Sequence, residues 1–163
     1  MTTVVALAQQ EIINLLIALK TNRMANNKSF LSFNLKRGFT PPNIPIATFY
    51  QNDTELNFII DTGSDDNVIC SEILPSLKYE ELEGDTPFAT AGGVQKVKSC
   101  NLNLQFGDET FTSKFLISDH LKESFDKIHE WNAVRLHGMI GSKFLMQNNI
   151  VLDFNNMIAY NTK

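Results

Sequence analysis

The chain alternates between short apolar runs and polar, turn-forming segments, a pattern typical of β-strands. Residues 46–50 and 56–60 are apolar runs around the polar segment 51–54, which predicts a hairpin. Residues 98–106 alternate apolar and polar side chains, and residues 110–117 follow a turn as their antiparallel partner. Further strands or hairpins are predicted over residues 30–35, 68–70, 88–97, 150–154 and 157–160, and residues 138–141 are an apolar pair between two glycines. The sequence therefore predicts a mainly β protein.

The N-terminal region carries a helical pattern instead. Residues 4–20 have a wide apolar face that is interrupted by polar residues such as Glu11. The uninterrupted apolar runs are too short to span a membrane, and no Lys or Arg precedes them as in a signal peptide. Residues 21–29 are polar and Asn-rich, as in a linker. We expect residues 1–29 to be a helix and linker, residues 30–163 to be one domain, and the protein to be cytoplasmic without a membrane partner.

A second helical pattern covers residues 120–132. Its apolar side chains recur at helical spacing and predict one stripe that packs against the domain: Leu121, Phe125, Ile128 and Trp131. Asp119 precedes the pattern and is expected to cap the first turn. A shorter helix is expected over residues 142–147.

Composition excludes several classes of function. The 163 residues suffice for one domain with a core, and the formal net charge of −4 without a Lys/Arg cluster argues against a nucleic-acid partner. Cys70 and Cys100 lie in apolar or strand-like contexts, which favours buried free thiols over a disulfide. The three histidines lack the spacing of a metal site. Neither a metal nor a cofactor is expected.

The most informative stretch is the apolar strand 58–60 and the loop after it. The strand ends in Asp61, which Thr62, Gly63 and Ser64 follow. Burial at the edge of a core raises the pKa of a carboxyl group, and neighbouring dipoles can hold it in place. Glycine permits a tight turn, and the two hydroxyl groups can donate hydrogen bonds. In many proteins an Asp-Gly turn after a strand is only a turn, so the rest of the chain decides between a turn and a catalytic loop.

From about residue 46 onward, the order of elements resembles the retropepsin-like aspartic proteases, the single-domain group that includes retroviral proteases. Residues 60–68 resemble their catalytic loop with the two acids after it. Residues 139–145 and then 150–154 resemble their helix and last strand. The resemblance implies a closed acid-protease barrel with a flap hairpin and a short C-terminal helix. This chain adds an N-terminal helix and an inserted helix near residues 120–132.

The resemblance also implies a role for each matching residue. Asp61 would be the catalytic carboxylate, Thr62 would brace the loop of a partner chain, and Gly63 would present its carbonyl group to the substrate. Ser64 would donate a hydrogen bond to the carboxylate from outside. Ser64 would also bind the substrate, and Asp65 and Asp66 would line its subsites. The tip of the flap over the bound peptide would be formed by Thr90, Ala91, Gly92, Gly93 and Val94.

The chain departs from the viral pattern in three places. Viral enzymes carry an arginine just after the apolar-apolar-Gly segment, where this chain has Ser142 and then Lys143. The intrachain ion pair with Asp65 is therefore not expected in its viral form, although Lys143 could substitute in part. The helix near residues 120–132 is an insertion, and the chain continues past Phe154 into another strand.

Aspartic proteases hydrolyse peptides with two carboxylates around one water molecule. Two such groups about 3 Å apart share one proton, so that one acts as base and the other as acid. The chain contains one Asp-Thr-Gly and no second Asp-(Thr/Ser)-Gly. A symmetric homodimer would supply Asp61 twice. The sequence therefore predicts a homodimeric aspartic endopeptidase with a peptide or protein substrate.

Two other interpretations belong to different functional classes. The first is a non-catalytic dimerisation or peptide-binding module on the same fold, in which Asp61→Asn would leave binding intact. The second is a phosphotransfer aspartate, which is disfavoured because no DxD spacing precedes Asp61 and no Lys-Thr-Gly-Thr segment is present.

Overall fold

The computed structural model describes residues 32–34, 44–90 and 92–161, with side chains from residue 44 onward. The strands of this part are β1 (Ser32–Asn34), β2 (Ile46–Gln51), β3 (Thr54–Ile60), β4 (Asn67–Ile69), β5 (Tyr79–Thr90), β6 (Gly93–Phe106), β7 (Glu109–Ile117), β8 (Gly138–Ile140), β9 (Ile150–Asp153) and β10 (Ile158–Asn161). The helices are the 3₁₀ helix η2 (Ser71–Ser76), α2 (Lys122–Asn132) and α3 (Ser142–Gln147). The predicted helix 4–20 and linker 21–29 lie outside the described residues.

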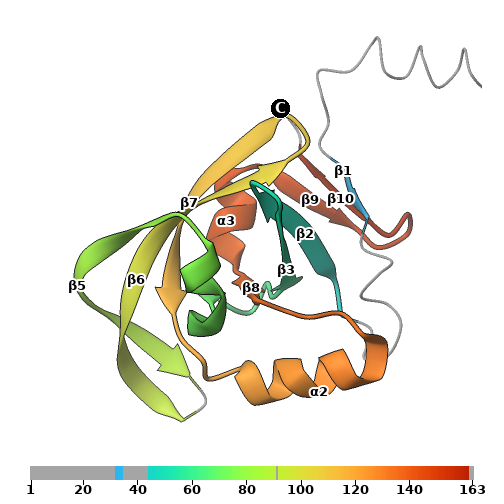
Figure 1. Cartoon of the computed structure of the whole chain (residues 1–163). Helices are drawn as coiled ribbons and strands as arrows, with labels where there is room; N and C mark the ends of the chain where they lie inside the picture. The colour runs from blue at the N-terminus through green and yellow to red at the C-terminus, as the bar shows by residue number, and fades with distance from the viewer. Residues whose placement is uncertain (1–31, 35–43, 91, 162–163) are drawn as a thin grey trace, which may run out of the picture. The chain divides into compact units, whose positions relative to one another are not determined.

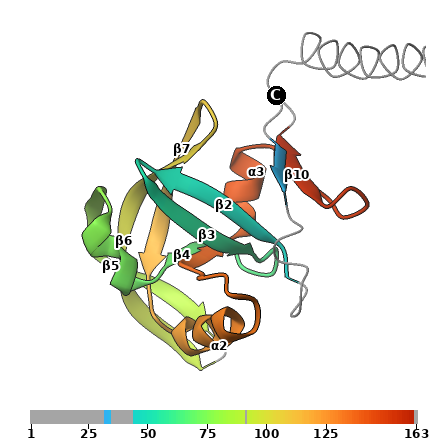
Figure 2. The same cartoon turned by 45° about the vertical axis from the view of Figure 1, so that its right-hand side comes forward.

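Six strands close into a barrel, which Figures 1 and 2 show from two sides. They follow the order β2-β3-β8-β4-β7-β6, and a bridge between Tyr50 and Gln105 returns from β6 to β2. β5 lies outside this closed set, and among the strands that the structure describes it pairs with β6 alone. The prediction of a mainly β, closed barrel is confirmed.

Two parallel pairings explain the short continuous apolar runs in the sequence. β3 pairs with β8 and β4 pairs with β7, both in parallel, whereas β4 and β8 are antiparallel. Every residue of β4 and β8 is buried. Strands covered on both faces carry consecutive apolar residues instead of an alternating pattern.

The barrel core is built around Phe49 of β2. Its ring makes edge-on contacts with four other phenylalanines, at centroid distances from 5.8 to 6.4 Å: Phe58, Phe106, Phe111 and Phe144. Phe144 belongs to α3, so the helix is anchored to the barrel by the same cluster. The alternating face predicted for residues 98–106 also points inward, since Cys100, Leu102 and Leu104 are fully buried.

A second, three-stranded sheet is formed by the end of the chain. Its order is β1-β10-β9, and both pairings are antiparallel. The hairpin predicted from residues 150–160 is therefore present, and β1 adds a strand from the region predicted over residues 30–35.

The β5–β6 hairpin is longer than the predicted hairpin over residues 88–97. Pairing runs from Tyr79–Leu102 to Thr90–Gly93, with a register shift between Leu82 and Thr86. Gly84 lies within this shift with a φ of 80°, a backbone conformation that favours glycine. The first half of β5 is mostly exposed, so its sequence lacks the apolar alternation that would have predicted a strand.

α2 packs through Phe125, with Leu121 and Ile128 beside it, against a small apolar cluster that includes Ile46 and Leu136. Trp131 was expected in the same stripe, but its side chain is 65% exposed. That prediction is wrong because the helix contacts the barrel with a narrower face than the spacing suggested.

Asp119 does not cap α2 with its side chain, in contrast to the prediction. Its carboxylate oxygens accept hydrogen bonds from Ser71 N at 2.8 Å and Ser71 Oγ at 2.5 Å, and only its backbone carbonyl accepts from Lys122 N. The side chain therefore joins the start of η2 to the entry of α2.

Both cysteines are buried and unpaired, as predicted. Burial raises the pKa of the Cys70 thiol to about 12 and that of the Cys100 thiol to about 11, so neither is a reactive thiolate near neutral pH. None of the helices in the described ranges has the length and apolar character needed to cross a membrane.

Candidate active site

Asp61 directly follows β3, at the point where the strand leaves the barrel. Its backbone N–H donates to the carbonyl oxygen of Ile140 in β8 at 3.0 Å, so the strand pairing continues up to this residue. One carboxylate oxygen, Oδ1, accepts from Gly63 N at 2.9 Å. No residue in the described part of the chain donates to Oδ2. The carboxylate is therefore oriented by its own loop and keeps one oxygen available for a ligand.

The loop after Asp61 is clamped to the turn between β8 and α3. Ser142 N donates to Ser64 O at 2.7 Å, and Lys143 N donates to Asp65 O at 3.2 Å. Gly141 makes this approach possible, because a Cβ atom there would lie 2.5 Å from Asp66 O. The apolar-apolar-Gly segment noted in the sequence thus has a steric role beside the loop.

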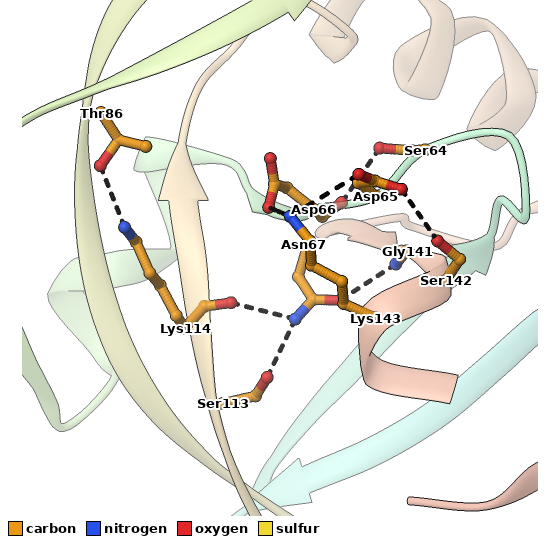
Figure 3. Close-up of polar contacts among 10 residues, drawn as sticks. All are labelled: Ser64, Asp65, Asp66, Asn67, Thr86, Ser113, Lys114, Gly141, Ser142 and Lys143. Carbon is orange, nitrogen blue, oxygen red and sulfur yellow. Dashed lines mark hydrogen bonds and ion pairs between the residues drawn. The ribbon is translucent and has the colours of Figure 1, made fainter. Parts of the chain in front are cut away.

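Asn67 fastens the same loop to two further elements, as Figure 3 shows. Its side-chain Oδ1 accepts from Gly141 N at 3.0 Å. Its Nδ2 donates to Ser113 Oγ and to Lys114 O, each at 3.0 Å. The side chain is almost completely buried. One amide therefore connects the Asp61 loop, β7 and the start of α3, a role that the sequence did not reveal.

Lys143 takes part of the position expected for an arginine. Its Nζ lies 3.0 Å from Asp66 Oδ1 and 3.7 Å from Asp65 Oδ2, and Ser142 Oγ lies 3.4 Å from Asp65 Oδ1 (Figure 3). The hydrogen bond to Asp66, followed by the charges of both acids, raises the pKa of the Lys143 ammonium group. The lysine pairs with both acids, and it holds Asp66 more closely than Asp65.

Ser64 does not contact the carboxylate of Asp61 in this single chain. Its hydroxyl group donates to Asp66 O at 3.1 Å, and its backbone N–H donates to Asp61 O at 3.3 Å. The expected hydrogen bond to the carboxylate is absent because the hydroxyl closes the turn of the loop instead.

A cleft of about 510 Å³ lies over Asp61, between the loop, the β5–β6 hairpin and the entry of α2. It is lined by Asp61, Gly63, Ser64, Asp65, Asp66, Pro87, Phe88, Ala89, His120, Leu121 and Met139. The structure therefore brings five of the predicted site residues together in one cleft. Pro87, Phe88, Ala89, His120, Leu121 and Met139 were not predicted as site residues.

The remaining predicted site residues do not line this cleft. Thr62 is exposed beside it, and Thr90, Gly92, Gly93 and Val94 lie at the far end of the hairpin. Ala91 lies outside the described residues. The wall of the cleft on the hairpin side is formed by the residues before the tip, and Phe88 is the buried one among them.

The site is built from carboxylates, amides and apolar side chains. In the described ranges, no group of three or more His, Cys, Asp or Glu side chains is arranged to hold a metal ion. The chemistry available at Asp61 is that of a carboxylate with a free oxygen facing a cleft.

The chain was compared with family models, curated proteins and solved structures. No family model and no curated protein matches the chain. Among solved structures, the chain is similar to EIAV protease complexed with the inhibitor HBY-793, with 20% identity and a TM-score of 0.49. The match covers 66% of this chain and 90% of that chain. An identity of 20% and a TM-score of 0.49 do not show the family of this chain.

Proposed function

We propose that the protein is an aspartic-type endopeptidase whose active form is a homodimer. The observation that carries the proposal is the placement of Asp61. Its carboxylate follows a barrel strand, is oriented through one oxygen at 2.9 Å from Gly63 N, and lies in a cleft of about 510 Å³. The Asp-Thr-Gly loop, the clamp formed by the apolar-apolar-Gly segment and the hairpin beside the cleft support the proposal.

The reaction requires a second carboxylate next to the first. In the pair, the ionised group takes a proton from a water molecule, which attacks the carbonyl carbon of the peptide bond. The protonated group donates to the carbonyl oxygen, and a proton then passes to the leaving amine. Two carboxylates at short distance share one proton because ionising both is costly. A single Asp61 cannot perform both roles at once.

The sequence offers no other Asp-Thr-Gly or Asp-Ser-Gly for the second role. The other acids of the cleft, Asp65 and Asp66, are engaged with Ser142 and Lys143. In a twofold symmetric dimer, a residue near the axis meets its own copy. The second carboxylate is therefore Asp61 of a partner subunit, and the exposed Thr62 is available for contact with that subunit.

The substrate is an extended peptide. Peptides in this conformation add strand-like hydrogen bonds to exposed backbone groups, and alternate side chains enter pockets. The end of the β5–β6 hairpin acts as the flap, because β5 is paired on one side only among the described strands and its residues border the cleft.

The test is the digestion of a peptide library at acid and neutral pH by the purified chain and by Asp61→Asn. We expect the substitution to lower kcat/KM by about 10³-fold or more, since it removes both acid and base. Asp108→Asn is the matched control, because Asp108 is exposed in the turn between β6 and β7, away from the cleft. A statine-type inhibitor should block cleavage by the wild-type chain and by this control.

Two results would contradict the proposal. Equal cleavage by wild type and Asp61→Asn would assign the activity to a contaminant. A sedimentation experiment that shows a stable monomer which still cleaves peptides would contradict the proposal that the active form is a homodimer. Absence of cleavage, together with peptide binding that survives Asp61→Asn, would favour the alternative of a non-catalytic peptide-binding module.

A further inference from the structure

His120 lines the cleft, together with the acids of the Asp61 loop. Its ring meets Phe88 of the hairpin edge-on, with a centroid distance of 5.0 Å and an interplanar angle of 72°. Leu121 and Met139 line the cleft beside it. The cleft thus combines these three apolar side chains with one exposed imidazole, which is the only nitrogen-containing side chain among the described residues that line the cleft.

The segment that carries His120 is attached to β4 and η2 through the two residues that precede it. Ser118 N donates to the carbonyl oxygen of Ile69 in β4 at 3.0 Å. The carboxylate of Asp119 accepts two hydrogen bonds from Ser71, and its backbone carbonyl accepts from Lys122 N at 3.0 Å. His120 is therefore held in place by its neighbours, as a residue that selects a ligand must be.

The hydrogen bonds of the ring determine which nitrogen is left for a ligand. Ser118 Oγ lies 3.1 Å from His120 Nδ1, and the same oxygen accepts from His120 N at 3.5 Å. Nδ1 is therefore engaged with Ser118, and Nε2 is the ring nitrogen left for a ligand. Partial burial lowers the pKa of His120, which keeps the ring neutral near pH 7. In the tautomer that carries its proton on Nε2, the ring offers an N–H donor to a ligand in the cleft.

We propose that His120 is a specificity-determining residue, which selects substrates with a glutamine side chain at one position near the scissile bond. The apolar part of glutamine would pack on Phe88, Leu121 and Met139, and its amide oxygen would accept from His120 Nε2–H. A glutamate would fit the same space. However, Asp61, Asp65 and Asp66 line the same cleft, and like charges repel each other across it. This inference rests on the proposed peptidase function.

The test uses peptide sets that carry leucine, glutamine or glutamate at each position in turn. These side chains are similar in size, so the ratio of kcat/KM values reports the polar contact. For wild type, we expect one position at which glutamine is preferred over leucine and over glutamate. His120→Phe keeps an aromatic ring beside Phe88 but has no donor, and should lower the glutamine-to-leucine ratio about fivefold to tenfold at that position. His120→Gln keeps a donor and should retain part of the ratio.

His129→Gln is the matched control, because His129 lies on α2 and does not line the cleft. Its ratios should equal those of wild type. A glutamine-to-leucine ratio that is the same in wild type and His120→Phe at every position would overturn the proposal, as would a ratio that falls equally in His129→Gln. Failure of the proposed function looks different, since no peptide would then be cleaved in a manner that depends on Asp61.

Discussion

The Asp61 loop, residues 61–67, and the end of the β5–β6 hairpin, residues 87–90 and 92–94, each contribute residues to the same cleft but are held in different ways. The loop is bonded through its backbone to β8 and α3, and through buried Asn67 to β7. The hairpin end is mostly exposed, and the side chain of Thr90 forms hydrogen bonds within the turn, to Gly92 and Gly93. Phe88 is its one buried anchor among the described residues.

Under the proposed function, this difference gives each region a separate task. A carboxylate that must share a proton with its partner needs a fixed position, since a displacement of about 1 Å can cost two orders of magnitude in rate. A cover over a peptide must open to admit it, and exposed backbone hydrogen bonds with few buried contacts permit such opening. The following substitutions compare the two regions directly.

The largest effect is expected from Gly141→Ala. The new methyl group would lie 2.5 Å from Asp66 O and 2.8 Å from Asp65 C and O, so the clamp would have to open. We expect a loss of about 2–3 kcal/mol in the free energy of unfolding and a fall of about tenfold to a hundredfold in kcat/KM. Urea unfolding and peptide cleavage measure the two effects.

The same substitution in the hairpin is the control. A Cβ atom at Gly92 would lie 3.7 Å from Thr90 Oγ1, which is an ordinary contact. Gly92→Ala should leave the unfolding midpoint close to that of wild type. Equal destabilisation by both alanines would contradict the distinction between a fixed loop and a movable hairpin.

Asn67→Ala should have the next largest effect. The substitution leaves Gly141 N without its acceptor and Ser113 and Lys114 O without their donor, in a buried position. We expect the free energy of unfolding to fall by about 2 kcal/mol. Thr90→Ala removes two exposed hydrogen bonds of similar length and should cost about 0.5 kcal/mol or less. Thermal or urea unfolding of the two variants tests this difference, and a Thr90 effect as large as that of Asn67 would oppose it.

Much of the barrel could be predicted because buried strands and turns leave strong local signals. The alternation over residues 98–106 follows the buried face of β6, and the Asn-rich turns separate the hairpins. The Asp61 loop and the Gly141 segment were recognisable as motifs. The contact that joins the two segments could not be predicted, because Asn67 forms hydrogen bonds with residues that are distant in the sequence.

The incorrect or missing predictions have the same physical origin, namely contacts between residues that are distant in the sequence. Trp131 has helical spacing with Phe125 and Ile128, but only the tertiary contacts decide how wide the buried face of α2 is. Asp119 has the right position for a cap, yet Ser71 offers it two donors. His120 gave no motif at all. It enters the cleft only because α2 brings its segment beside Phe88, 32 positions earlier in the chain.

A smaller loss of stability is expected when the pH is lowered and His137 becomes protonated. His137 lies at the entry to β8 and is 7% exposed, and its Nδ1 accepts from Asn57 N at 3.0 Å. Burial, followed by the charge of Arg135, lowers the pKa of this imidazole below the ordinary value of 6.5. The unfolded chain therefore binds the proton more readily, so the contribution to stability is complete above about pH 6.5 and is lost as the pH falls below it.

The loss should approach about 1.4 kcal/mol per pH unit between pH 6.5 and the lowered pKa. Urea unfolding at pH 7.5 and pH 5.5 measures it. His137→Gln keeps an acceptor for Asn57 N but has no titrating group, and should show a shallower dependence. An identical pH dependence in both proteins would exclude this histidine as the cause.

The smallest effect is expected from Lys143→Met. The ion pairs of Lys143 with Asp65 and Asp66 are exposed, and exposed pairs are screened by salt. The unfolding midpoint should fall slightly at low salt and agree with wild type at 1 M salt. A large loss that persists in high salt would show that the lysine holds the loop through packing rather than through charge.

The claim that two copies of Asp61 make one active site can be tested by mixing subunits. Wild-type and Asp61→Asn chains are combined in equal amounts and allowed to exchange subunits. The peptidase activity of the mixture is then compared with that of a wild-type sample that contains the same total amount of protein. If each site needs both carboxylates, only about one dimer in four is active, and the mixture should retain about one quarter of the activity. Retention of about one half would show that each chain acts alone, and would contradict the account.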